Sequence, residues 1–541
     1  MVRRSRLVLL LAVVSAAVAA LATPGAASAR TDPPSATFQV IVVDHISDRA
    51  FAALARRGAV GLLRPGVGEV TNRRLSLAEL VRGHEIKPDH LNALGRNPLI
   101  GVDTTEVSHI AECHKCIVLE LPTKRGGWVA NAQLYRIAVV GYGYHGLLTS
   151  PRTRIPGLVS VFDVLPTTLP GRQTTSLSWT PAQNSVERVD ALNRQIGAND
   201  RLKLAALFIL AGLLLLLTLL RLRVAVTAVP AALLVNLLLG VTEVSNEVVL
   251  CAAMLVGTVL LAFLLSRFCR SDDALLLLFG GVVALYAATM VVRPEWQAIN
   301  PFGPTQNQRF WGIGNQVETL MLAPLLAGAV IAQRRFGLLG FALFGVFGLV
   351  VLTDNRLGAD GGGAITLGVA LAVLGWRLFR FRVRGFVTLL ASAALLVLWV
   401  VSRGLTQSGP NHLRHAFLGD GSGFVAVVKS LVPLSYLPAL HEWTIVVPLL
   451  LICAATFVVA RRRTTNPATR DLLLALGIAI ATSLLVNDSA AYVLAGGIAV
   501  IGAAARFAPT SGPVRVRARV PVFLRRFGVV AEPVASESPP S

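Results

Sequence analysis

Residues 307–322 read NQRFWGIGNQVETLML, and this stretch decides the fold because it puts a carboxylate, Glu318, into the start of an apolar run. A charged side chain at the centre of a membrane helix costs roughly 2.5–3.5 kcal/mol, and such residues face a cavity or a partner. Asn315 lies three residues before Glu318, so the two side chains share a helix face. The stretch therefore predicts a membrane helix whose first turn contributes to an internal polar site.

The composition places the whole chain among membrane proteins. Its 541 residues are 54% hydrophobic and only 15% charged, and several apolar runs exceed the roughly 18 residues that indicate a membrane helix. The formal net charge of +21 would indicate nucleic-acid binding in a soluble protein. Here most basic residues lie in short connections between apolar runs, which is the pattern that sets membrane topology. We therefore expect no nucleic-acid partner.

The apolar runs predict an α-helical polytopic membrane domain over residues 201–508, in contact with membrane lipids. By the length rule for membrane helices, we expect about 11 spans, at residues 203–221, 224–241, 247–266, 274–292, 316–333, 336–353, 363–380, 385–402, 443–460, 471–487 and 489–505.

The two ends of the chain predict its orientation. Residues 1–29, MVRRSRLVLLLAVVSAAVAALATPGAASA, read as a signal peptide cleaved after Ala29, or alternatively as an uncleaved anchor. In either case the segment that follows lies outside the cytoplasm. The dense arginine clusters fall in the alternate connections and in the tail, residues 509–541, which are then cytoplasmic; the tail also reads as disordered. We expect a multi-pass plasma-membrane protein with an extracytoplasmic N-terminal domain and a cytoplasmic C-terminus.

Residues 30–200 predict this extracytoplasmic domain to be a small α/β domain. FQVIVVDHI (38–46) and YRIAVVGYG (135–143) read as strands, and RAFAALARRGAVGLL (49–63) reads as a helix stopped by glycine. Strands that alternate with helical patterns indicate an α/β layer.

Among the five cysteines, Cys113 and Cys116 stand close together in HIAECHKC. A single CxxC lacks the second pair of ligands of a usual zinc site. In an exported domain we expect a local disulfide or a plain pair of thiols rather than a metal. No metal and no cofactor are expected in the chain.

Under this topology, polar segments from four parts of the chain meet at the external face. Arginine suits phosphate or carboxylate recognition, and histidine titrates near neutral pH. The glycines of GIG (312–314) and GADGGG (358–363) would let backbone N–H groups approach an anion. The expected acids and bases are Glu318, Asp360 and His412, and the expected substrate-binding residues are Arg309, Asn315, Asn355, Arg356, Asn487 and Asp488. The alternative is a set of separate, solvated loop residues.

The stretch GLLTSPRTRIPGLVSVFDVLPTTL (146–169) resembles a late segment of the alkaline phosphatase/sulfatase-like superfamily, and VIVVDHISD (40–48) resembles its first strand. Asp44 matches the position of the superfamily's first metal-binding aspartate. The remaining Asp and His ligands have no match, and Thr71 corresponds to the nucleophile only by position. The resemblance therefore implies a shortened, non-catalytic relative without zinc, because metal sites need their full ligand set.

The whole arrangement resembles uncharacterised actinobacterial multi-span envelope proteins that join such a domain to a membrane region. Its outward polar loops are similar to those of membrane glycosyltransferases and O-antigen ligases that use lipid-linked donors, an analogy of architecture alone. Three hypotheses stay open. They are an envelope enzyme acting on a lipid-linked, phosphate-containing substrate, a non-catalytic scaffold for cell-wall assembly partners, and a transporter or flippase.

Overall fold

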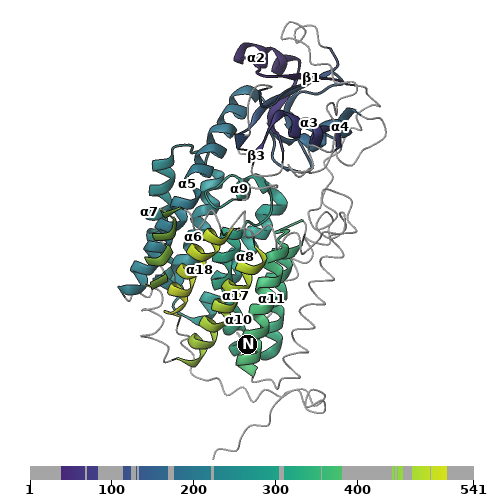
Figure 1. Cartoon of the computed structure of the whole chain (residues 1–541). Helices are drawn as coiled ribbons and strands as arrows, with labels where there is room; N and C mark the ends of the chain where they lie inside the picture. Colours follow the sequence, from purple (N-terminus) through teal and green to yellow (C-terminus); the bar gives the residue numbers. More distant parts are fainter. Residues whose placement is uncertain are drawn as a thin grey trace, which may run out of the picture.

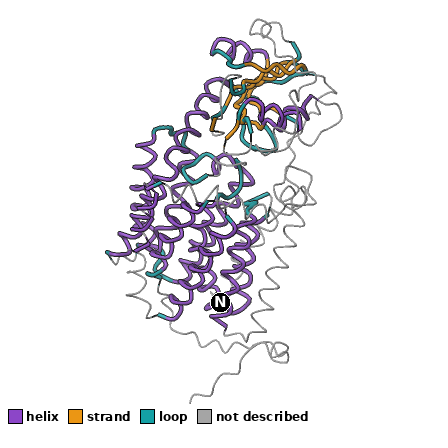
Figure 2. The backbone as a smooth tube through the Cα atoms, in the orientation of Figure 1, coloured by secondary structure: helices purple, strands orange, loops and turns teal. Residues whose placement is uncertain are grey.

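The structure is a computed structural model in which a small sheet domain stands on a bundle of helices (Figures 1 and 2). It describes residues 38–66, 70–82, 114–123, 129–130, 133–168, 176–220, 224–303, 310–354, 356–379, 436, 442–443, 445–447, 449–451, 453–454, 466–487 and 489–507. The expected signal peptide and the expected C-terminal tail lie outside these residues.

The N-terminal domain is built on a mixed sheet with the strand order β1-β4-β6-β2-β7-β9, and β8 also pairs with β2. The strands are β1 (Gln39–Val43), β2 (Gly58–Arg64), β4 (Cys116–Glu120), β6 (Tyr135–Val140), β7 (Gly146–Thr149), β8 (Leu158–Ser160) and β9 (Ser178–Thr180). A separate pair joins β3 (Val70–Thr71) to β5 (Val129–Ala130). The predicted α/β domain and its two predicted strands are confirmed.

Helices cover both faces of this sheet. Helix α2 (Asp48–Arg57) ends at Gly58, as predicted, but the following GAVGLL is the fully buried strand β2 rather than more helix. A run that is buried along its whole length fits a central strand. Helix α2 lies on one face, and α3 (Arg73–Arg82), the short η3 (Val161–Asp163) and α4 (Val164–Thr168) lie on the other.

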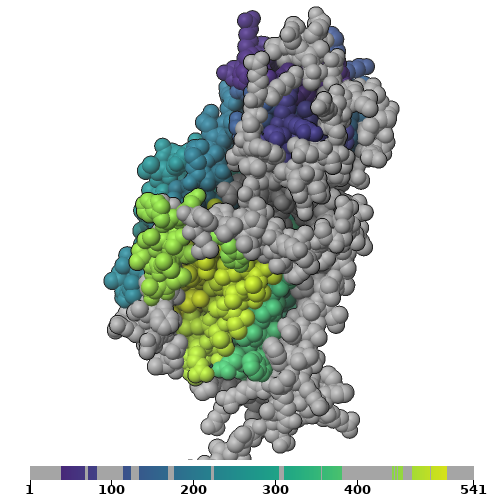
Figure 3. Space-filling view, in the orientation of Figure 1, coloured from purple at the N-terminus to yellow at the C-terminus, as the bar shows by residue number. Residues whose placement is uncertain are grey.

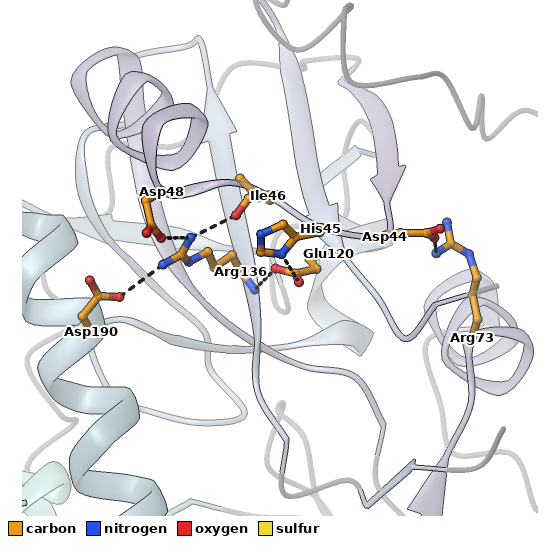
Figure 4. Close-up of polar contacts among 8 residues, drawn as sticks. All are labelled: Asp44, His45, Ile46, Asp48, Arg73, Glu120, Arg136 and Asp190. Carbon is orange, nitrogen blue, oxygen red and sulfur yellow. Dashed lines mark hydrogen bonds and ion pairs between the residues drawn. The ribbon is translucent and has the colours of Figure 1, made fainter. Parts of the chain in front are cut away.

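One continuous helix, α5 (Ser185–Leu219), joins the domain to the bundle. Its 35 residues span about 52 Å at 1.5 Å per residue. Near its start, Asp190 pairs with Arg136 of the sheet at 3.6 Å, and Arg136 also holds Asp48 of α2 at 2.7 Å (Figure 4). The domain boundary expected at residue 200 therefore falls inside a helix.

The bundle contains helices that suit a membrane. Six described helices are long and apolar enough to cross a membrane, and two shorter apolar helices accompany them. Large apolar side chains stand exposed on their outer surfaces, as on α7, where lipid rather than water is the compatible surrounding. The bundle helices are α6 (Ala225–Val241), α7 (Glu247–Phe268), α8 (Asp272–Val292), α9 (Pro294–Ala298), α10 (Asn315–Thr353), α11 (Gly361–Phe379), α17 (Pro467–Val486) and α18 (Ala490–Ala504).

Helix α10 is an antiparallel hairpin rather than one rod. Its 39 residues would be about 58 Å long if straight, nearly twice the ~30 Å hydrocarbon core. At Gly337 the backbone takes a non-helical φ of 67°. A Cβ at Gly328 would lie 2.4 Å from Phe344, and one at Gly348 would lie 2.6 Å from Leu325, so the two halves pack side by side. These halves match the predicted spans 316–333 and 336–353.

The bundle has two distinct ends, which we call the domain end and the far end. Both ends of the α10 hairpin lie at the domain end, where the backbone N–H of Ile313 donates to the carbonyl of Gly358 at 2.9 Å. Ion pairs join helix termini at the far end, namely Arg335 with Asp273 and Arg377 with Asp471, both at 2.8 Å. Helix α8, the two halves of α10, and α11 thus alternate in direction, whereas the membrane topology stays a prediction. The expected span 385–402 lies outside the described residues and 443–460 is described only in part, so the number of 11 stays a prediction.

Candidate functional site

Glu318 lies in the first turn of α10 at the domain end and is completely buried. The side-chain amide of Asn487, which ends α17, donates to Glu318 Oε2 at 2.8 Å. The same Nδ2 also donates to Ser483 Oγ at 2.8 Å, which fixes the orientation of the amide. The predicted proximity of Glu318 and Asn487, 169 residues apart in the sequence, is confirmed.

A second carboxylate, Asp360, lies beside Glu318. Asp360 directly precedes α11, is 4% exposed, and accepts a hydrogen bond at Oδ1 from the N–H of Gly363 at 2.9 Å, as a helix N-cap does. A Cβ at Gly363 would lie 3.0 Å from both Glu318 Cγ and Asp360 Oδ2, so these two atoms are no more than about 6 Å apart. The site therefore holds two buried carboxylates, one from the first turn of α10 and one from the connection between α10 and α11.

The glycines around the site make room for its own side chains. A Cβ at Gly362 would lie 1.8 Å from Asn487 Oδ1, so only glycine fits there. Gly312 has a φ of +88°, and its missing Cβ lets residue 312 approach the carbonyl of Gly358. The sequence predicted that these glycine runs open the backbone to an anion. In the structure, carboxylates and an amide fill that space instead.

The described groups that act on Glu318 include no basic side chain. The positive end of the α11 dipole, worth about half a charge, points at both carboxylates. Among the residues that the structure describes, none donates a hydrogen bond to Glu318 Oε1. The Thr366 hydroxyl is buried close to this carboxylate, yet its geometry falls short of a hydrogen bond and it has no other partner in the described part of the chain. Two ionised carboxylates this close in a low-dielectric interior repel each other strongly.

The other predicted site residues are placed as follows. Asn315 is half-buried, and its carbonyl accepts a hydrogen bond from Thr319 at 2.6 Å. The expected contact of its side chain with the site around Glu318 stays a prediction. Arg356 is exposed, and its backbone N–H donates to Asp354 at 2.8 Å. Four predicted residues lie outside the described ranges, namely Arg309, Asn355, His412 and Asp488. The catalytic and binding roles of the whole set stay predictions.

The N-terminal domain contacts the segment that directly precedes α10. The guanidinium of Arg154, from the turn between β7 and β8, stacks on the Trp311 ring with its Cζ 3.6 Å from the centroid. Part of Arg154 remains exposed, but burial of its guanidinium lowers its pKa to about 10, opposed by Asp354 and reinforced by Arg356. Trp311 leads within a few residues to Glu318. Nothing in the sequence pattern marks Arg154 or Trp311 as partners, because the contact depends on how the domain sits on the bundle.

In the domain, Asp44 and Asp163, which lie in the two stretches with the superfamily resemblance, are each bonded to an arginine. Asp44 accepts a hydrogen bond from Arg73, at the carboxyl end of β1 (Figure 4). Asp163 is fully buried and accepts from Ser150 and, at 3.0 Å, from Arg152 Nε. The arginines supply the positive charge that these carboxylates need, and the non-catalytic nature of the domain stays a prediction.

Two further expectations for the domain concern Thr71 and the cysteines. Thr71 is buried and shares a hydrogen bond with Ser76 at 2.9 Å, so its hydroxyl is not open to solvent. Cys116 is disulfide-bonded, whereas Cys251, Cys269 and Cys453 are free thiols. Cys113 lies outside the described residues. The disulfide agrees with the expected alternative to a zinc site.

The buried carboxyl of Asp163 predicts a pH dependence of stability. Burial, opposed by Arg152 and Ser150, raises its pKa from 3.8 to about 6. The pKa of Asp163 is higher in the folded protein than in the unfolded chain. Its contribution to stability is therefore fully present below pH 3.8 and is lost as the pH rises through about 6. We expect a loss of about 3 kcal/mol across this window. Thermal unfolding of Asp163→Asn between pH 4 and 7 should lack this component, and an unchanged pH profile would contradict the assignment.

No protein-family model, curated protein sequence or solved structure matches this chain. The resemblance to the alkaline phosphatase/sulfatase-like superfamily therefore stays a prediction. The function has to be argued from the geometry of the site.

Proposed function

We propose that this chain is a cell-envelope membrane transporter or flippase in which Glu318 and Asp360 form the coupling group. The observation that supports this most is a completely buried carboxylate, Glu318, hydrogen-bonded to Asn487 and within about 6 Å of a second carboxylate in a bundle of apolar helices. Ionisable residues inside membrane segments characteristically mark proton or ion pathways.

Closure of the site favours transport over chemistry on a bound substrate. Glu318 and Asp360 are 0% and 4% exposed, whereas an acid or base must reach its substrate within hydrogen-bond distance. The site is assembled from the start of α10, the start of α11 and the end of α17. Helix termini are also the elements that line the substrate and ion sites of many transporters.

The cargo that we propose is an amphiphilic, lipid-linked compound containing phosphate. Arg154 and Arg356 lie close enough to influence each other at the junction of domain and bundle, beside Asp354. Arginine recognises phosphate through its planar fork. The same pair of arginines favours the second candidate, an envelope enzyme that acts on such a substrate at the membrane face, with Glu318 or Asp360 as acid or base.

A deletion strain distinguishes these functions. If the chain moves a lipid-linked compound outward, that compound accumulates in the deletion strain where a membrane-impermeant reagent, such as periodate on intact cells, cannot reach it. Accumulation of a reagent-accessible compound supports the enzyme instead. If no lipid-linked compound accumulates, both functions fail and a scaffold for cell-wall assembly partners remains.

The membrane orientation belongs to the same proposal and has its own test. The far end carries the arginine-rich connections, so we expect it to face the cytoplasm. Single cysteines at Glu243, in an exposed domain-end connection, and at Arg270, exposed at the far end, report the two sides, once the three free cysteines are replaced by serine. In intact cells an impermeant maleimide should label Glu243→Cys and spare Arg270→Cys. The reverse pattern would refute the orientation.

A further inference from the structure

The polar site contains oxygen atoms from several side chains. Among the described residues, no basic side chain lies between them. Glu318 Oε1 and Thr366 Oγ1 are both buried, and neither has a hydrogen-bond partner among the described residues. Asp360 lies on the same side of Gly363 as Glu318, and the amide of Asn487 closes the site from α17. Unsatisfied buried oxygen atoms of this kind cost free energy unless they bind a ligand.

The charges that face Glu318 leave room for one positive charge. Its neighbours from α11 and α17 are neutral, namely Thr366, Ser483 and Asn487, and Asp360 is the titratable group among the described residues that acts on it. Two carboxylates carry up to two negative charges, and the α11 N-terminus offsets about half of one. A single monovalent cation therefore brings the charge of these described groups close to neutrality.

A divalent metal fits the same atoms less well. Ca²⁺ takes six to eight oxygen ligands, and Mg²⁺ keeps several waters in an octahedral shell. The described residues contain no group of three or more His, Cys, Asp or Glu side chains that could hold a metal ion. The closed site offers two carboxylates, hydroxyls and an amide, which suits a small cation without a large water shell.

We infer that the chain binds one monovalent cation, a proton or Na⁺, between Glu318, Asp360, Thr366 and Asn487. The inference rests on the proposed function for the role of this site, because it makes the cation the coupling ion. Cation binding itself requires neither cargo nor cells. It can therefore be measured separately from transport.

The test uses the purified full-length protein in lipid nanodiscs. For Na⁺, we expect saturable binding of ²²Na⁺ at one ion per chain and a rise in Tm of about 3–5 °C in saturating NaCl over choline chloride at equal ionic strength. For a proton, we expect no ²²Na⁺ binding but a Tm that falls as the pH rises in choline chloride. Measured in an Asp163→Asn background, which removes the pH dependence due to Asp163, either dependence should be absent in Glu318→Gln and retained in Glu243→Gln, the exposed domain-end control.

Thr366→Val separates the two ions. It keeps the shape and removes the hydroxyl, so it should weaken Na⁺ binding at least ~10-fold while leaving a proton-dependent Tm nearly unchanged, because a hydroxyl is a metal-ion ligand but not the group that takes up the proton. Asp360→Asn should lose the dependence as Glu318→Gln does, which keeps the test informative if one variant does not fold.

Two results separate the failure of this inference from the failure of the proposed function. If wild type and Glu318→Gln respond identically to Na⁺ and pH, the cation site is refuted, whatever the deletion strain shows. If Glu318→Gln loses its cation dependence yet prevents accumulation of the lipid-linked compound in the deletion strain, the cation site stands and the coupling role is refuted.

Discussion

Replacing Glu318 with glutamine is expected to abolish function while the protein stays folded and inserted. We expect the rate of the proposed transport to fall at least ~100-fold. Glutamine keeps the size of the side chain, and its carbonyl oxygen can still accept the hydrogen bond that Asn487 donates at 2.8 Å. The change removes the negative charge that the proposed coupling step requires. In this buried site, water cannot replace the interaction that the charge made. The measurement is rescue of the deletion strain by the variant, at matched abundance.

The control for this prediction is Glu243→Gln, which removes a carboxylate from an exposed position at the same end of the bundle. It should rescue as well as the wild type, since an isolated surface charge contributes little. If Glu318→Gln rescues equally well, Glu318 is a buried structural residue and the proposed coupling role is wrong. If the variant is not inserted, Glu318→Asp, which keeps the charge, decides whether charge or shape is required.

Replacing Gly362 with alanine is expected to disrupt the site through packing alone. The new Cβ would lie 1.8 Å from Asn487 Oδ1, so the amide has to move and its hydrogen bond to Glu318 is lost. Overpacking costs about 1–3 kcal/mol and loss of a hydrogen bond to a charged group costs about 1.5–3 kcal/mol. We expect a total destabilisation of about 3 kcal/mol and a loss of rescue, measured by thermal unfolding and in the deletion strain.

The matched control is Gly477→Ala, in α17, where a Cβ would meet nothing within 4 Å. Alanine in a helix interior is favoured over glycine by about 1 kcal/mol, so this variant should be neutral or slightly stabilised. If Gly362→Ala and Gly477→Ala have the same stability and rescue, Asn487 does not occupy the space beside Gly362.

The sequence predicted those features that depend on local composition. The length of each apolar run predicted the two halves of α10, which the structure confirms as a hairpin turning at Gly337. The cost of a carboxylate in an apolar helix predicted that Glu318 would find a polar partner, and Asn487 is that partner. Local physics was sufficient in both cases because the membrane penalises each polar group individually.

The features that escaped prediction depend on contacts between distant segments. The strand order β1-β4-β6-β2-β7-β9 follows no sequence order, so pattern alone leaves it open. The stack of Arg154 on Trp311 joins residues from the domain and the bundle whose local sequences carry no signal. The glycines before α11 were interpreted as an opening for an anion, because the side chains that fill the space come from α10 and α17.

The adjacency of α11, α17 and α18 is a further feature that depends on contacts between distant segments. Figure 3 shows α17 and α18 beside α11 on one face of the molecule. Asn487, at the end of α17, completes a site whose carboxylates come from the middle of the chain. Composition identifies each of these helices, whereas their adjacency follows only from packing.

The continuous helix α5 has a mechanical consequence. It begins on the sheet, where Asp190 is held by Arg136, and ends at the far end, where the carbonyl of Thr218 accepts a hydrogen bond from Arg506 Nε at 2.9 Å. A rod without a proline or a break transmits a pull or a twist over its whole length, about 52 Å. We therefore expect a displacement of the domain relative to the bundle to reach the far end of α5, where Thr218 contacts Arg506.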